Sequence, residues 1–238
     1  MRSGIRRGGV AALAISAAAC GDSNGPGGGA AALLTAGSYV DYDTASTGAE
    51  SSQLEFTLKS FGVTVTPVNA IDSANLATIL AGTGAFVIPE VGGDIALDLT
   101  EGAKTVLRRF VDSTGGVLIV TADGPGFALL DTLFTYSIVA GPDSQYTHLD
   151  AAGAAGTPFA GGPSILYENE GTYYIDVSTL PAAGDAIYTH TGGTYASVAY
   201  IPQGRGVVVL IGWNWYNAAP HGSQDGGWLE ILRRALRS

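Results

Sequence analysis

The side chains of this 238-residue chain that are best suited to chemistry are polar groups at the ends of expected strands. Asp123 follows the apolar run at 117–121, in VLIVTADGPGF, where a buried strand meets a sharp turn. Ligands of parallel sheets bind beyond the carboxyl ends of the strands. Asp123 can therefore act as a nucleophile or base in an ester or glycoside hydrolase, with His221 orienting it. Alternatively, its carboxylate caps the next helix by meeting free backbone N–H groups.

Other polar side chains are expected at the same edge, because they lie in loops that follow the first, third, fourth and last core strands. Packed carboxylates repel one another, so such a group implies raised pKa values, a bound cation or intervening water. A Ca²⁺ site from Asp41, Asp43 and a neighbour is an alternative, although the regular spacing and glycines of a calcium loop are missing. The residues expected to converge are Asp41, Asp43, Glu90, Asp94, Asp98, Asp123, His221 and Asp225. Of these, we predict Asp41, Asp43, Glu90 and Asp225 as ligand contacts.

An aromatic segment, WNWYN at 213–217, follows the last core strand. Alternation along an extended chain places Trp213 and Trp215 on the same face. Sugar rings stack on aromatic faces and bond to nearby amides and carboxylates, so Trp213, Asn214 and Trp215 are predicted to bind a saccharide. Alternatively, one or both indole rings pack under the final helix, against Trp228. His148 and His190 are too far apart and too poorly accompanied to predict a metal site.

The elements that must position these residues alternate between strands and helices. Strands are expected at 30–36, 63–68, 85–88 and 117–121, and helices at 50–61, at 72–80, from Thr100 onward and at 127–134. Such an order predicts an α/β fold with a right-handed parallel sheet covered by helices on both faces, in three layers.

The second half of the chain is β in character. Regular periodicity is lost from 141 to 162, and strands are expected at 165–167, 172–177, 186–190, 195–201 and 207–213, before a closing helix at 228–236. We interpret 141–200 as a β elaboration at one end of the sheet. Residues 30–238 are thus expected to form one domain.

The amino-terminal residues 1–19 are predicted to be a secretory signal, with three arginines before a short apolar run. The sequence Ala-Ala-Ala-Cys-Gly at 17–21 resembles the lipobox of bacterial lipoproteins, which implies a lipid on Cys20, the only cysteine. The alternative is an ordinary cleavage site with a coincidental cysteine. Residues 20–29 form a flexible tether. The resemblance implies export and membrane anchoring, and Gly21 implies the outer membrane or the periplasmic face where two membranes exist.

The net charge of the chain limits the classes of partner that it is expected to bind. Without residues 1–19, eight basic and twenty-one acidic residues leave a net charge of −13. Such a surface repels phosphate backbones, so nucleic acid is not an expected partner. After the signal, no segment has the roughly 20 apolar residues that a membrane-spanning helix needs.

Three segments resemble the class I glutamine amidotransferase-like superfamily, in particular its flavodoxin-like, ThuA-related branch: LLTAGS, RRFVDSTGGVLIVTADGPG and GRGVVVLIGWNWYNAAP. In catalytic members a cysteine follows the central strand, and a histidine with a glutamate two residues later follows the last core strand. Here those positions hold Asp123, His221 and Ser223. The resemblance therefore implies the fold without thioester chemistry, which has no nucleophile. No cofactor is expected.

Three functions remain open from the sequence. The first is an exported, lipid-anchored binding domain for a saccharide or an envelope protein. The second is a hydrolase that uses Asp123 and His221, and the third is a purely structural envelope protein. A deep pocket with Asp123 and His221 in hydrogen-bond reach favours the hydrolase, whereas a filled edge with buried Trp213 and Trp215 favours a structural role.

Overall fold

The computed structural model describes residues 29–40, 49–92, 95–121, 124–142 and 146–238. The predicted signal, the tether and Cys20 lie outside these ranges, except for Gly29, and so do four of the predicted edge residues, Asp41, Asp43, Asp94 and Asp123. None of the helices within these ranges has the length and hydrophobicity to cross a membrane.

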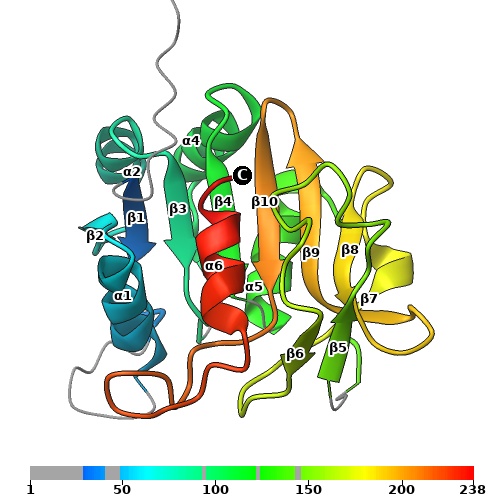
Figure 1. The fold of residues 1–238 in the computed structure, drawn as a ribbon. Helices are drawn as coiled ribbons and strands as arrows, with labels where there is room; N and C mark the ends of the chain where they lie inside the picture. The colour runs from blue at the N-terminus through cyan, green and yellow to red at the C-terminus, as the bar shows by residue number, and fades with distance from the viewer. Residues whose placement is uncertain (1–28, 41–48, 93–94, 122–123, 143–145) are drawn as a thin grey trace, which may run out of the picture.

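Ten strands form one mixed sheet in the order β2-β1-β3-β4-β10-β9-β8-β5-β6, with β7 paired to β9 (Figure 1). The first five strands in this order are parallel to one another. Every residue of β3 and β4 is buried, as expected for strands that are covered on both faces. The parallel strands are β2 (Thr64–Val68), β1 (Ala30–Leu34), β3 (Ala85–Ile88), β4 (Val117–Thr121) and β10 (Gly206–Ile211).

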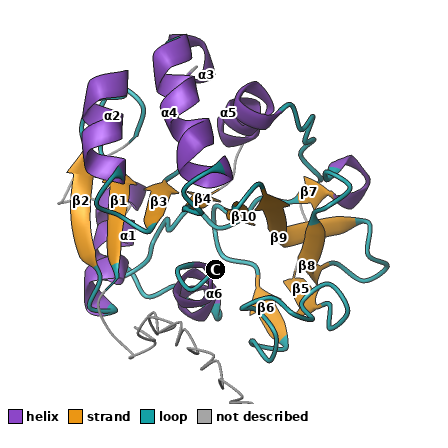
Figure 2. Cartoon of the chain, turned by 90° about the horizontal axis from the view of Figure 1, so that it is seen from above, coloured by secondary structure: helices purple, strands orange, loops and turns teal. Residues whose placement is uncertain are grey.

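Helices cover both faces of the parallel strands, which confirms the predicted three-layer α/β fold (Figure 2). One face carries α1 (Glu50–Ser60) and α6 (Trp228–Ala235), and the other carries α2 (Ser73–Leu80), α3 (Ile95–Asp98), α4 (Glu101–Asp112) and α5 (Gly124–Phe134). Two of the predicted helix starts are confirmed by their caps. The Asp72 carboxylate accepts from two backbone N–H groups of α2 at 3.0 Å, and the Thr100 hydroxyl accepts from Ala103 N at 3.2 Å in α4.

The β elaboration extends the same sheet, because β9 pairs antiparallel with β10. Its strands are β5 (Tyr146–Leu149), β6 (Ile165–Tyr167), β7 (Ile175–Asp176), β8 (Asp185–Thr189) and β9 (Tyr195–Gln203), with a 3₁₀ turn, η1 (Val177–Thr179), after β7. The sheet curls at this end, so that β5 and β6 come round to the side on which α6 lies (Figure 2).

Three expectations about the elements were wrong in detail. The stretch at 141–162 contains β5, which is too short to show a period. The loop expected after the third core strand, which includes Asp98, contains α3. The strand expected at 172–177 is reduced to β7, because its first residues bond elsewhere: Thr172 bridges to Trp213, and Tyr173 N donates to Gly212 O at 2.7 Å.

Candidate functional site

Glu90 is the described carboxylate that lies most centrally at the carboxyl edge of the parallel strands, directly after β3. Its Oε1 accepts a hydrogen bond from the Tyr173 hydroxyl at 3.2 Å, and its Oε2 accepts from Asn214 Nδ2. The loops after β3 and β10 therefore meet, as the sequence predicted. Both donors are neutral, and within the described ranges no basic group forms an ion pair with Glu90.

Both the nitrogen and the oxygen of the Asn214 side-chain amide form hydrogen bonds in this network. Its Oδ1 accepts from Tyr216 N at 2.9 Å, and its side chain is buried. Its backbone N donates to Gly171 O at 3.2 Å. A Cβ at Gly171, where φ is +78°, would collide with the Asn214 amide. Only glycine therefore allows the chain at 171 to approach Asn214 this closely.

A segment of the β elaboration, residues 169–173, lies across the end of β10. The Trp213 indole N–H donates to Glu170 O at 3.1 Å, and the Asn169 amide donates to Asp225 O at 3.2 Å. Gln224 Oε1 accepts from Glu170 N at 3.1 Å. The segment is thus bonded on one side to the end of β10 and on the other to the loop that leads to α6. It covers part of the edge where ligands of this fold class bind.

Trp213 and Trp215 are fully buried, contrary to the prediction that sugar rings stack on them. Their rings stack on each other with centroids 4.9 Å apart, and Trp228 lies 6.3 Å from Trp213. The Trp215 indole N–H donates to the Thr57 hydroxyl of α1 at 3.2 Å. The other interpretation, packing under the final helix against Trp228, is therefore confirmed. Neither indole ring has a free face for a sugar, because residues 169–173, α1 and α6 cover the two rings.

Asp225 and His221 lie on the long loop between β10 and α6, and both are exposed. The Asp225 carboxylate accepts from Gly227 N at 3.1 Å and from Leu229 N at 3.2 Å, so one of its oxygens holds the start of α6. These backbone bonds give Asp225 a structural role beside the predicted ligand contact. The predicted pair of Asp123 and His221 has no described geometry, because Asp123 lies outside the described residues.

Asp98 contributes to the same edge through Tyr39, whose hydroxyl donates to Asp98 Oδ2 at 2.9 Å. Burial and the hydrogen bond to the neighbouring Asp98 carboxylate raise the pKa of the Tyr39 hydroxyl above its ordinary value. Within the described part of the chain, no three His, Cys, Asp or Glu side chains are grouped to hold a metal ion. The Ca²⁺ alternative at Asp41 and Asp43 stays a prediction.

Sequence reasoning missed the residues that close this edge, Tyr173 and Gly171. Tyr173 was expected to lie within a strand of the elaboration, and its partner Glu90 is 83 positions away. No local pattern marks such a contact. The short Glu-Gly-Thr stretch at 170–172 indicates a turn, but it does not indicate what the turn covers.

Comparisons with known proteins give the fold and no more. No family model and no curated protein matches the sequence. A ThuA-like protein from Bacteroides uniformis ATCC 8492 superimposes with a TM-score of 0.57 at 11% identity, over 88% of this chain and 90% of that one. The chain has a flavodoxin-like α/β fold similar to the ThuA type. A β-galactosidase from Rahnella sp. R3 matches with a TM-score of 0.51 at 15% identity, over 87% of this chain but only 30% of the enzyme.

Proposed function

We propose that the protein is an exported, lipid-anchored binding protein whose amidotransferase-like domain performs no catalysis. It is attached to the membrane through Cys20 and holds a ligand, of which a saccharide is one class, or a protein partner at the cell envelope. The outer membrane is the destination we propose for a cell with two membranes. Nucleic acid is not among the proposed partners.

The observation that supports this proposal best is the mutual bonding of the described side chains at the carboxyl edge. Tyr173 and Asn214 both donate hydrogen bonds to Glu90, and Trp213 and Trp215 are in the core. Polar groups that already satisfy one another must be separated before they can bind a substrate, at the cost of their hydrogen bonds. An edge of this kind favours a structural role for these groups, with a ligand bound elsewhere on the molecule, over turnover.

The amino-acid composition supports the same proposal from a different direction. The only cysteine is Cys20, outside the domain, so the domain lacks the thiol on which amidotransferase chemistry depends. The same cysteine lies in the lipobox-like sequence. A single cysteine used only for anchoring accounts both for the lipobox-like sequence and for the absence of a thiol from the domain.

Anchoring is tested by labelling cells that express the full chain with radioactive palmitate. We expect label on the wild type and its loss in Cys20→Ser, together with release of the protein from the membrane fraction. Label that persists in Cys20→Ser, or no label on the wild type, overturns the anchoring proposal.

Absence of catalysis is tested with the full-length protein on glutamine and on panels of nitrophenyl esters and glycosides. We expect no turnover above that of a His221→Ala variant. Turnover by the wild type that His221→Ala abolishes would instead establish the hydrolase alternative, because His221 was predicted to assist Asp123.

A further inference from the structure

The outer face of the β5–β6 hairpin carries exposed aromatic side chains that the proposed function does not use. Tyr146 is 44% exposed and Tyr167 is 63% exposed. They are direct cross-strand partners in the antiparallel pair, so both point to the same side of the sheet. His148, two residues after Tyr146, is also exposed on this side. We call Tyr146, His148 and Tyr167 the aromatic face.

The aromatic face is a group, whereas the other exposed hydrophobic side chains of the described residues stand singly. Phe56 lies on α1, Leu97 on α3 and Val139 in the loop after α5, and isolated exposed hydrophobic residues are ordinary. The Tyr146 and His148 rings meet edge to face, with centroids 5.2 Å apart at 87°. The opposite sides of β5 and β6 are buried, through Thr147 and Leu166. The outward rings are thus held on a strand pair whose other side is core.

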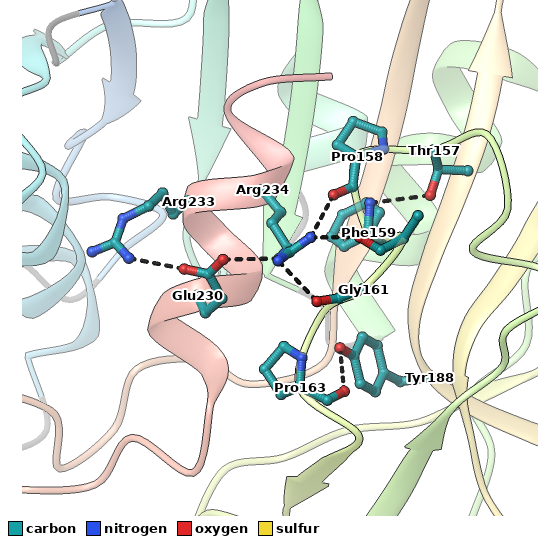
Figure 3. A network of polar contacts seen from close by, with 10 residues as sticks. Thr157, Pro158, Phe159, Gly161, Pro163, Tyr188, Glu230, Arg233 and Arg234 are labelled. Atoms are coloured by element: carbon teal, nitrogen blue, oxygen red, sulfur yellow. Dashed lines mark hydrogen bonds and ion pairs between the residues drawn. The ribbon is translucent and has the colours of Figure 1, made fainter. Parts of the chain in front are cut away.

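The connection between β5 and β6 is fastened to α6, which makes the aromatic face rigid. Figure 3 shows Arg234 of α6 reaching the carbonyl groups of this connection. Its Nη1 donates to Pro158 O and Ala160 O at 2.9 Å, and its Nη2 donates to Gly161 O at 3.2 Å. Glu230 Oε1 accepts from Arg234 Nε at 2.9 Å and orients the guanidinium.

Two further hydrogen bonds hold the chain after the Arg234 contacts, at the start and at the end of β6. The buried Tyr188 hydroxyl donates to Pro163 O at 2.8 Å, just before β6. The Trp228 indole N–H donates to the carbonyl of Tyr167 itself at 2.8 Å. A surface whose backbone is held in this way loses little conformational entropy when a ligand binds, and this is how preorganised sites gain affinity.

The chemistry of the aromatic face favours an uncharged saccharide as its occupant. Tyrosine rings present an electron-rich face, which attracts the electropositive C–H face of a sugar ring, and a hydroxyl for hydrogen bonding. Exposed carboxylates follow Tyr167 in sequence, at Glu168 and Glu170, and the whole chain carries a charge of −10. An anionic polymer is repelled by such a surface, and a nonpolar partner leaves the hydroxyl groups without bonds. A neutral sugar chain complements both the rings and the charge.

We propose that the aromatic face of β5 and β6 binds a neutral polysaccharide. This inference rests on the proposed function, since it names the ligand class and the surface of a binding protein at the envelope. The predicted saccharide site moves from the buried tryptophans to the exposed tyrosines of the elaboration.

The experiment is native electrophoresis of the full-length protein, in detergent, through gels that contain galactomannan, xylan or polygalacturonate. Retardation by a neutral polymer, and none by anionic polygalacturonate, is the expected result. Tyr167→Ala and Tyr146→Ala should each weaken binding about fivefold to tenfold, as removal of one stacking ring does. Tyr167→Phe keeps the ring and should retain most of the affinity.

The matched control is Phe56→Ala, which removes an aromatic side chain that is 47% exposed on α1, on another element of the molecule. Its retardation should equal that of the wild type. Retardation that survives the double variant Tyr146→Ala/Tyr167→Ala overturns the inference, and so does the absence of retardation by both neutral polymers.

Light scattering tests whether the aromatic face joins copies of this chain instead of binding a polysaccharide. If the double variant has a smaller particle mass than the wild type in the same detergent, the aromatic face joins copies of this chain, and the inference is overturned. None of these results depends on palmitate labelling or on the turnover assays. Failure of the saccharide site is therefore distinguishable from failure of the proposed function.

Discussion

The tryptophans at the carboxyl edge and the tyrosines on the aromatic face are both candidate surfaces for a ligand, but they differ in what covers them. Trp213 and Trp215 lie under residues 169–173 and beside two helices, with their indole N–H groups bonded to the protein. Tyr146 and Tyr167 face outward from a strand pair whose backbone is anchored from behind. Within the described residues, part of the edge that usually carries function in this fold class is covered, whereas the added strands carry an open surface.

Carboxylates at the two regions differ in a similar way. Glu90 at the carboxyl edge receives hydrogen bonds from neutral groups, a tyrosine and an asparagine. Glu230 behind the aromatic face is paired with Arg233 at 2.8 Å and Arg234 at 2.9 Å. The second arrangement neutralises charge and fastens elements together. The first arrangement contains no cationic partner for Glu90 among the described residues.

The largest expected difference between the two regions is in how much stability the protein loses when one aromatic ring is removed. Trp215→Ala should lower the free energy of unfolding by about 3–5 kcal/mol, because it empties a fully buried volume. Tyr167→Ala should change it by less than about 0.5 kcal/mol, since the ring is exposed. Urea denaturation of both variants makes the comparison. Similar losses in the two would contradict it.

The next effect is expected at Arg234. Arg234→Ala should lower the free energy of unfolding by about 2–3 kcal/mol, because it leaves three carbonyl groups of the β5–β6 connection without their charged donor. Arg233→Ala breaks an exposed ion pair and a contact with the Phe61 ring, and should cost about 1 kcal/mol or less. An Arg234→Ala loss no greater than that of Arg233→Ala would show that the connection does not depend on α6.

A smaller effect is expected from the network at the edge. Glu90→Ala should cost about 1–2 kcal/mol and Tyr173→Phe about 1 kcal/mol, and the double variant should cost less than their sum, because both remove the hydrogen bond between these two side chains. A double-mutant cycle in urea measures the difference. Strict additivity would mean that the two side chains do not meet in solution.

The last effect, which is confined to alkaline solution, is a dependence of stability on pH. Burial raises the pKa of the Tyr188 hydroxyl from about 10 to about 12, and the nearby Arg234 guanidinium opposes the rise. Between these values the unfolded chain releases the proton and the folded chain keeps it, so stability should fall as pH rises from about 10 to about 12. Tyr188→Phe should remove part of that fall in urea titrations. An identical pH profile for the variant would contradict this assignment.

Most of the parallel half of the fold could be predicted from the sequence. The way in which residues 169–173 cover part of its carboxyl edge could not. The apolar run at 117–121 is β4, and Asp72 caps α2, because local pattern and capping chemistry decide both. The contact of Tyr173 with Glu90, by contrast, depends on how a distant segment folds back. The residue types of Trp213 and Trp215 were compatible with both a sugar site and a core, and only the path of residues 169–173 distinguishes them. The pairing of Tyr146 with Tyr167 could not be predicted from residue types either, because it depends on the register of β5 and β6.

The covered edge is tested most directly by tryptophan fluorescence, since the chain has only three tryptophans, Trp213, Trp215 and Trp228, and all are fully buried. Acrylamide should quench the folded full-length protein weakly, and unfolding in urea should make quenching strong. This result would agree with rings enclosed by residues 169–173 and the helices. Strong quenching of the folded protein that is lost in Trp215→Phe would mean that the edge is open, and would contradict the account.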